Sequence, residues 1–428
     1  MFNQNGLSLD QAPPISVVFT FFLTGALFGI VSGISLFFYG VEVFDSTSVG
    51  AVTFTHLLTL GVMLSFMFAA LFQMLPVIAG ITLTSPQKKA NLLLYPFILG
   101  LISLLLGFNF TQNSWLFLLA SGFLAFAIFM TIIPMLNKLL TLAHHTPSSK
   151  GMSIALLTLA VVLLLALYLL STLSGIIEGH YYTQIKTAHY SFGLFGWIAL
   201  LIISISFQVI EMFYVTPPYP KNISHNLPLT LFVILGGTTL LGFFYSSIWI
   251  ISHMVLSFIL IFYALLTLKR LSQKKRPLSD ATVWFWRVGL SFLILSMFLI
   301  LLGELITVPF VKALSFIFFS AFALSIVFAM FYKIVPFLTW FHLNSQGYFT
   351  APMMHEVIHP KTAMKHLYIH GSTIVTFVLS LFINSFIYLA GLLMLLSFSW
   401  MAYQIIHAHK LYKETQKNGE KFDMGNIA

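Results

Sequence analysis

The chain has 428 residues, of which 59% are hydrophobic and only 7% are charged. Soluble domains carry about 25% charged residues, so this composition excludes a soluble globular protein. Cysteine is absent, which excludes disulfides, thiolate metal sites and cysteine nucleophiles. Apolar runs of about 20 residues, the length that crosses a bilayer as a helix, recur along the whole chain. The sequence therefore predicts an all-α, polytopic membrane protein.

The apolar runs predict twelve transmembrane spans, each bounded to within a few residues. In chain order these are 15–40, 52–80, 91–108, 114–137, 152–176, 187–214, 228–246, 248–268, 284–307, 313–340, 364–384 and 386–408. The stretch MFNQNGLSLDQAPPI before them has no basic n-region and no A-x-A-like cleavage site, so we expect the first span to be the membrane anchor. Residues 409–428 are expected to form a polar cytoplasmic tail.

The formal net charge of +9 comes from basic residues that concentrate in alternate loops. Loops after even-numbered spans hold most of them, whereas the opposite loops contain only Lys186 and Lys312. Loops rich in lysine and arginine stay in the cytoplasm, so we expect both termini to be cytoplasmic in a bacterial-type inner membrane. The charge thus indicates orientation in a lipid bilayer, and it requires no nucleic-acid partner.

Spans 2, 6 and 10 are longer than their neighbours and look alike. Each contains a polar residue followed three positions later by proline or glutamate: Gln73 and Pro76, Gln208 and Glu211, Lys333 and Pro336. The first two also begin with a histidine that a glycine follows four or five residues later: His56 and Gly61, His189 and Gly193. This period of four spans predicts three pseudo-repeated four-helix arcs, at about 15–137, 152–268 and 284–408.

Span 2 also carries a resemblance to a known family. Its sequence THLLTLGVMLSFMFAALFQMLPVIAG has His56 followed by Met63, Phe66, Pro76 and Gly80. A protein of twelve spans in three arcs with this pattern resembles subunit I of the haem–copper oxidase superfamily, including the haem- and copper-associated proteins of nitric oxide tolerance. The resemblance implies that His56 is an axial ligand of a haem b, with copper as a second candidate cofactor.

The chain departs from the family at the binuclear centre. The oxidases have a histidine pair at span 7 and two histidines in span 10, whereas here span 7 has no such pair and span 10 has only His342, at its cytoplasmic end. The arginine pair that usually meets the haem propionates is missing too. The resemblance therefore implies at most one haem or copper site. Electrons would come from another respiratory subunit or from quinol, because the chain has no haem-c motif.

The candidate ligands at the outer helix mouths are His56, His189 and His253. Imidazole binds haem iron or copper through one ring nitrogen while a hydrogen bond orients the other. If spans 2 and 6 are neighbours, His56 and His189 face a shared pocket, and Lys186 and Lys312 are candidates to meet haem propionates. The alternative is that the histidines are interfacial and bonded to loop carbonyls, and that the lysines are solvated.

Polar side chains inside the apolar helices form a second candidate site, which comprises Gln208, Glu211, Lys333 and Glu304. A charge at the centre of a bilayer costs about 2.5–3.5 kcal/mol on insertion scales, so partners are expected. Glu211 and Lys333 lie at matching depths and are candidates to pair across the repeat, in a proton path or as a structural clamp. The same residues suit a secondary transporter or channel, which is the main alternative function.

The histidine-rich stretch PMMHEVIHPKTAMKHLYIH (352–370) contains a zinc-protease pattern in His355, Glu356 and His359. His366 or His370 would be the third ligand. Pro360 follows at once, and we expect the stretch to be a short cytoplasmic loop, so a membrane metalloprotease is the least favoured function. The four histidines remain candidates for a secondary metal or pH-sensing site, and the other interpretation is a solvated loop.

The leading hypothesis is a haem-binding membrane protein, with copper as a further candidate, that acts in respiratory electron transfer, nitric oxide handling or oxidase assembly. It would lack a complete oxygen-reducing centre, and whether it is an enzyme stays open.

Overall fold

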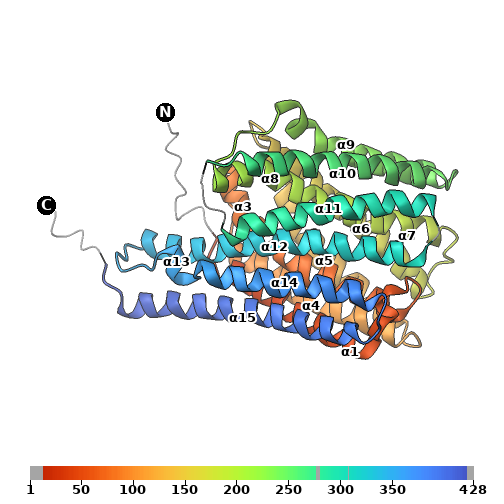
Figure 1. The fold of residues 1–428 in the computed structure, drawn as a ribbon, viewed down its shortest axis with the longest axis horizontal. Coiled ribbons are helices and arrows are strands. Elements are labelled where there is room, and N and C mark those ends of the chain that lie inside the picture. Colours follow the sequence, from red (N-terminus) through yellow and green to blue (C-terminus); the bar gives the residue numbers. More distant parts are fainter. Residues whose placement is uncertain (1–12, 276–279, 307, 422–428) are drawn as a thin grey trace.

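The computed structural model describes residues 13–275, 280–306 and 308–421, which form a helical bundle without β-strands. The long helices lie side by side along the longest axis (Figure 1). The helical elements are α1 (Ile15–Tyr39), η1 (Gly40–Phe44), α2 (Val49–His56), η2 (Leu57–Leu64), α3 (Ser65–Ala79), α4 (Pro86–Asn109), α5 (Trp115–Leu140), α6 (Pro147–Leu173), α7 (Tyr182–Ser191), η3 (Phe192–Ala199), α8 (Leu200–Tyr214), α9 (Lys221–Gly242), α10 (Ile248–Ser272), α11 (Ala281–Leu305), α12 (Pro309–Ser345), α13 (Met354–Val357), α14 (Pro360–Ser380) and α15 (Phe386–Asn418).

Eleven helical segments of the described chain are long and apolar enough to cross a membrane. The all-helical character expected from the sequence is therefore confirmed, and the length and composition of these helices fit a multi-pass membrane protein. The predicted span 364–384 corresponds to α14, which has 21 residues but is not among the eleven. Its first half carries Lys365, His366 and His370, which lower its hydropathy. It packs against α11, α12 and α15. Of the twelve predicted spans, eleven therefore correspond to the apolar segments, and the twelfth corresponds to α14.

Three segments are buried more deeply than the others. They are Val49–Pro76, Tyr182–Tyr214 and Phe310–Ser345, in which 78%, 78% and 67% of the most apolar stretch is buried, against 28–61% in the other eight. These are the spans that the sequence singled out as long and alike. They are therefore the inner helices of the bundle, while the division into three arcs stays a prediction.

The first two inner segments change from α-helix to π-helix just beyond their histidines. The π-helices η2 and η3 each have eight residues, and they follow α2 and α7 respectively. The third inner helix, α12, stays α-helical over its 37 residues. Because π-helical turns are rare and are frequent at functional sites, they direct attention to this end of α2 and α7.

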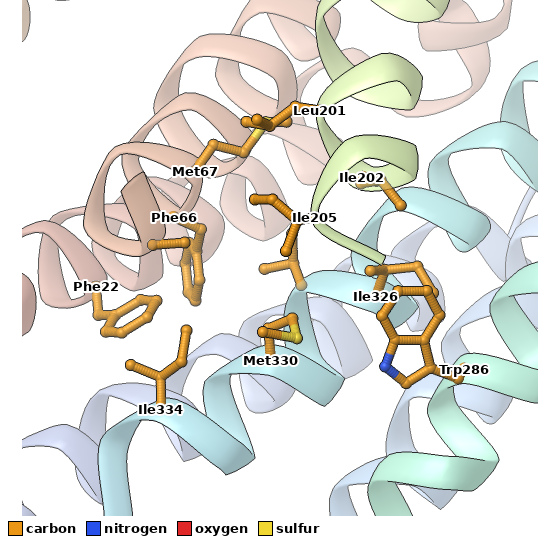
Figure 2. Close-up of a pocket in the computed structure, with 12 residues that line it drawn as sticks. Phe22, Phe66, Met67, Leu201, Ile202, Ile205, Trp286, Ile326, Met330 and Ile334 are labelled. Atoms are coloured by element: carbon orange, nitrogen blue, oxygen red, sulfur yellow. The ribbon is translucent and has the colours of Figure 1, made fainter. Parts of the chain in front are cut away.

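A cavity of about 50 Å³ lies between the inner helices. Figure 2 shows that Phe66 and Met67 of α3, Leu201 and Ile205 of α8, and Met330 of α12 surround it. The lining is apolar apart from the Trp286 indole nitrogen, and a buried water needs two to four polar partners, so such a cavity stays dry. The centre of the bundle is thus apolar, and polar chemistry has to be sought nearer the helix ends.

The first and last long helices touch backbone to backbone. In α1, Gly25, Gly29 and Gly33 follow one another at intervals of four residues and so share a face. A Cβ atom at Gly33 would lie 2.8 Å from the Gly391 carbonyl oxygen and 2.8 Å from the Leu395 nitrogen, both on α15. Small residues allow this approach, as is common between membrane helices. The contact joins the two ends of the described chain.

The start of α1 lies beside the last turns of α15. The rings of Phe19 and His409 are in contact, with centroids 6.4 Å apart. The helix α15 continues without a break to Asn418, so the first part of the expected polar tail is helical. Residues 422–428 of the predicted tail lie outside the described residues.

Candidate functional site

The helices α2 and α7 bring His56 and His189 together. The centroids of the two imidazole rings are 6.4 Å apart, and the ring planes are inclined by only 14°. Both side chains are half-buried, although they belong to inner segments of the bundle. Two residues 133 positions apart in sequence (189 − 56) thus share one space, which is the arrangement expected if spans 2 and 6 are neighbours.

Backbone carbonyl groups orient both rings. His56 Nδ1 lies 2.8 Å from the Val52 oxygen of its own helix, and His189 Nδ1 lies 3.2 Å from the Val162 oxygen of α6. Because a carbonyl oxygen only accepts hydrogen bonds, each Nδ1 carries the proton and each Nε2 keeps its lone pair. A ring held through one nitrogen with the other free is the usual state of a metal-binding histidine.

Aromatic packing and open space adjoin the two rings. The Phe108 ring of α4 contacts the His56 ring, with centroids 5.1 Å apart. Gly193 lies one helical turn beyond His189, and a Cβ atom added there would meet no atom within 4 Å. The space over Gly193 is therefore free of protein atoms.

The two lysines expected near this site take different positions. Lys186 is exposed on α7, one turn before His189 and on the same side of that helix. Lys312 is exposed near the start of α12, and no described contact joins it to either histidine. The arrangement therefore keeps Lys186 as a candidate to bind an anionic group beside the pair, and it gives no such support to Lys312.

His253 belongs to a separate cluster. Its Nε2 lies 3.3 Å from Ser191 Oγ, and its Nδ1 lies 3.9 Å from a carboxylate oxygen of Glu304. Ser191 follows His189 by two residues, which is roughly 200° around a helix of 3.6 residues per turn. His253 therefore contacts the other side of α7, and the three predicted ligands separate into a pair and a single histidine.

Glu211 and Lys333 have partners other than each other. A carboxylate oxygen of Glu211 accepts a hydrogen bond from the Tyr219 backbone N–H at 2.9 Å, so it fixes the loop after α8. Lys333 Nζ binds Asp280 at 2.7 Å, at the start of α11. The expected pair across the repeat does not form. Gln208 lies one turn before Glu211 and is half-buried.

Asp280 is a functional partner of Lys333 that the sequence pattern did not indicate. Asp280 is the N-cap of α11 and accepts a hydrogen bond from the Val283 N–H. Its position directly before the apolar run ATVWFW is a recognisable signal for an N-cap. Its pairing with a lysine 53 residues later depends on how α11 and α12 pack.

The ion pair predicts a dependence of stability on pH. Burial alone would raise the pKa of Asp280, but the Lys333 ammonium, the Thr282 hydroxyl and the Val283 N–H together lower that pKa below its ordinary value of 3.8. The carboxylate therefore stabilises the fold above about pH 4, and this stabilisation is lost as the pH falls through the lowered pKa. Both groups are partly exposed, so we expect a loss of about 1 kcal/mol or less.

Thermal unfolding in detergent between pH 7 and pH 3 measures this effect. Asp280→Asn should be less stable than the natural chain at pH 7, and this difference should shrink as the pH falls towards 3. Lys333→Met should remove the part of this pH dependence that the ammonium causes, and the double variant should remove no more than Asp280→Asn alone. A pH profile that Asp280→Asn leaves unaltered would contradict the expected role of the pair.

The zinc-protease pattern does not form a metal site. The helix α13 contains His355 and Glu356 and ends at Val357, and His359 is the N-cap of α14. Extended backbone at Ile358 separates the two histidines, so they do not share a helix face. All three side chains are exposed, and Glu356 binds the Met353 backbone N–H at 2.7 Å. In the described part of the chain, no group of three or more His, Asp or Glu side chains is arranged to hold a metal ion.

His366 and His370 lie inside the bundle, so the expectation of a solvated loop is wrong for them. They are 0% and 3% exposed, on the face of α14 that contacts its neighbours. His366 Nε2 is 2.6 Å from Ser397 Oγ, and His370 Nε2 is 2.9 Å from Ser325 Oγ. The spacing of four residues in a helix that begins at Pro360 was the available signal. The predicted cluster thus divides into an exposed half and a buried half.

No protein-family model matches this chain, and no curated protein matches it. The relationship to the haem–copper oxidases therefore stays a prediction, based on the sequence around His56 and on the expected layout of the spans.

Proposed function

We propose that the protein binds one redox centre, a haem b, between His56 and His189. The observation behind this proposal is the near-parallel pair of imidazoles with centroids 6.4 Å apart. Two imidazoles that bind one metal ion from opposite sides through bonds of about 2 Å have ring centres roughly 6 Å apart. The hydrogen bonds of both Nδ1 atoms to carbonyl groups leave the Nε2 atoms as the metal ligands.

A haem fits this donor set better than a bare metal ion. Two neutral imidazoles supply only two ligands, whereas a porphyrin supplies four more, and axial histidine ligation of haem iron is common. The Phe108 ring and the open space over Gly193 offer an apolar, accessible surface for a macrocycle. Lys186, exposed one turn away, would bind a propionate. Copper bound by the same two histidines is the alternative that the experiment below distinguishes.

A haem bound by two histidines supplies one-electron redox chemistry. His56 and His189 would hold the iron, and their carbonyl partners, Val52 and Val162, fix the orientation of the two rings. We place the protein in electron transfer of a respiratory membrane, nitric oxide handling or oxidase assembly, with no complete oxygen-reducing centre. A transporter built on Glu211 and Lys333 is not favoured, because each side chain has another partner.

Absorption spectroscopy and metal analysis of the purified protein test the proposal. The preparation should contain about one iron per chain and give the reduced-minus-oxidised spectrum of a low-spin haem with two histidine ligands. A haem-free preparation with about one copper per chain would assign the pair to copper. A colourless preparation without copper, from cells supplied with haem and copper, would contradict the proposal.

The open space over Gly193 gives a steric test of the same site. Gly193→Leu should lower the haem content several-fold because the new side chain fills that space, while the melting temperature stays within a few degrees of the natural value. Gly236→Leu on α9 is the matched control, since Gly236 is also a helical glycine at which an added Cβ atom would meet no atom within 4 Å. Equal haem content in both variants would show that the space is not the binding site.

A further inference from the structure

The buried histidines of α14 have no role in the site at His56 and His189. His366 is fully buried among aromatic side chains of two helices, α11 and α12. Its ring centroid lies 4.7 Å from that of Phe328, 5.7 Å from that of Tyr332 and 5.9 Å from that of Phe285. An ionisable group inside an apolar bundle is a candidate functional site by default.

Three polar atoms in this region have no hydrogen-bond partner. They are His366 Nδ1, Tyr332 Oη and Trp400 Nε1, and each is shielded from solvent. A buried polar group without a partner costs about 1–3 kcal/mol. Unpartnered buried atoms call for an explanation, and an ordered water molecule is a common one.

The three atoms belong to side chains that are neighbours on α12, α14 and α15. His366 binds Ser397 through Nε2, and Trp400 lies one turn beyond Ser397 on the same side of α15. The Trp400 indole is a neighbour of the Tyr332 hydroxyl, but neither Trp400 Nε1 nor Tyr332 Oη completes a hydrogen bond. The Tyr332 ring in turn contacts the His366 ring. The three side chains that carry the unpartnered atoms are therefore neighbours in the bundle.

We propose that His366, Tyr332 and Trp400 bind one buried water molecule, and that His366 exchanges its proton with solvent through this water. A buried water typically makes about three hydrogen bonds. It can accept from the indole N–H, donate to or accept from the tyrosine hydroxyl, and serve either tautomer of His366. A metal ion is a poor occupant, because the indole nitrogen only donates. In addition, no carboxylate is among the described contacts of His366.

His370 provides an internal reference within the same helix. Its Nε2 pairs with Ser325 Oγ, and the Ala321 carbonyl accepts a hydrogen bond from its ring. Both of its ring nitrogens thus form hydrogen bonds with protein groups, so we expect no water molecule to bind His370. The proposal is independent of haem or copper at His56 and His189.

Water-edited solid-state NMR of the full chain, labelled with ¹⁵N-histidine and reconstituted in lipid, tests the proposal. Magnetisation from water should reach a ring nitrogen of His366 several-fold faster than the ring nitrogens of His370. His366→Gln and His370→Gln assign the two signals. Equal, slow transfer to both rings would overturn the proposal.

Two conservative variants keep the test decisive if a histidine variant does not fold. Tyr332→Phe and Trp400→Phe each remove one partner of the water while preserving an aromatic ring. Each should slow the transfer to His366 several-fold and leave His370 unchanged. Transfer to His366 at the natural rate in both variants would show that these residues do not hold the water, and it would overturn the assignment.

Discussion

Replacing His56 or His189 by alanine is expected to lower the haem content of the purified protein by about tenfold or more, since changes to the outer shell of a metal site alone typically cost 10–100-fold. Either change removes one of only two protein ligands. The remaining imidazole keeps its bond to a carbonyl, so the fold around it should persist. Pyridine haemochrome assays measure the haem content, and the visible spectrum shows whether any residual haem has lost its second histidine.

His225→Ala is the matched control for these variants. His225 lies on α9, is partly exposed, and its Nδ1 binds the Lys221 carbonyl at 2.9 Å, four residues earlier in the same helix. This local geometry repeats that of His56 and Val52, without a second histidine beside it. The control should retain full haem content. Haem lost equally from His225→Ala would mean that general destabilisation, and not ligation, explains the result.

The second large effect is expected at the contact between α1 and α15. Gly33→Val should destabilise the protein by about 3 kcal/mol, because overpacked sites typically lose 1–3 kcal/mol and no side-chain rotation relieves this one. A Cβ atom at residue 33 would meet the Gly391 oxygen and the Leu395 nitrogen, both backbone atoms, at 2.8 Å. The two helices would have to separate. Melting temperature and yield in mild detergent measure the change.

Gly122→Val separates this steric effect from the loss of a helical glycine. Gly122 lies within α5, is exposed, and has no atom within 4 Å of an added Cβ. The substitution changes backbone freedom in the same way without a clash. We expect it to unfold near the natural temperature. If Gly33→Val unfolded at the same temperature as Gly122→Val, the close contact would not be important for stability.

Much of the fold follows from the sequence because length and hydropathy decide it. A run of about 20 apolar residues has few alternatives to a membrane helix. The similarity of spans 2, 6 and 10 also identified the inner helices, which are the most buried segments. The equivalent positions of His56 and His189 at the mouths of two such helices were enough to expect a shared pocket.

The predictions were wrong where the rotation of a helix about its axis decides which neighbour a side chain meets. The sequence showed that Lys333 needs a partner, but only the packing of α11 and α12 directs it to Asp280 instead of Glu211. In the same way, hydropathy could not show that His366 and His370 face inward from α14. The π-helices after His56 and His189 left no local signal beyond the glycines.

The contact between Gly33 and Gly391 also bears on how the protein is made. Helices enter the membrane in the order of their synthesis, so α1 must wait in lipid until almost the whole chain has been translated. During that time the face of α1 that carries Gly25, Gly29 and Gly33 can pack against another membrane helix with small residues. The bundle closes only when α15 arrives, and a chain that stops before residue 386 would keep this face open.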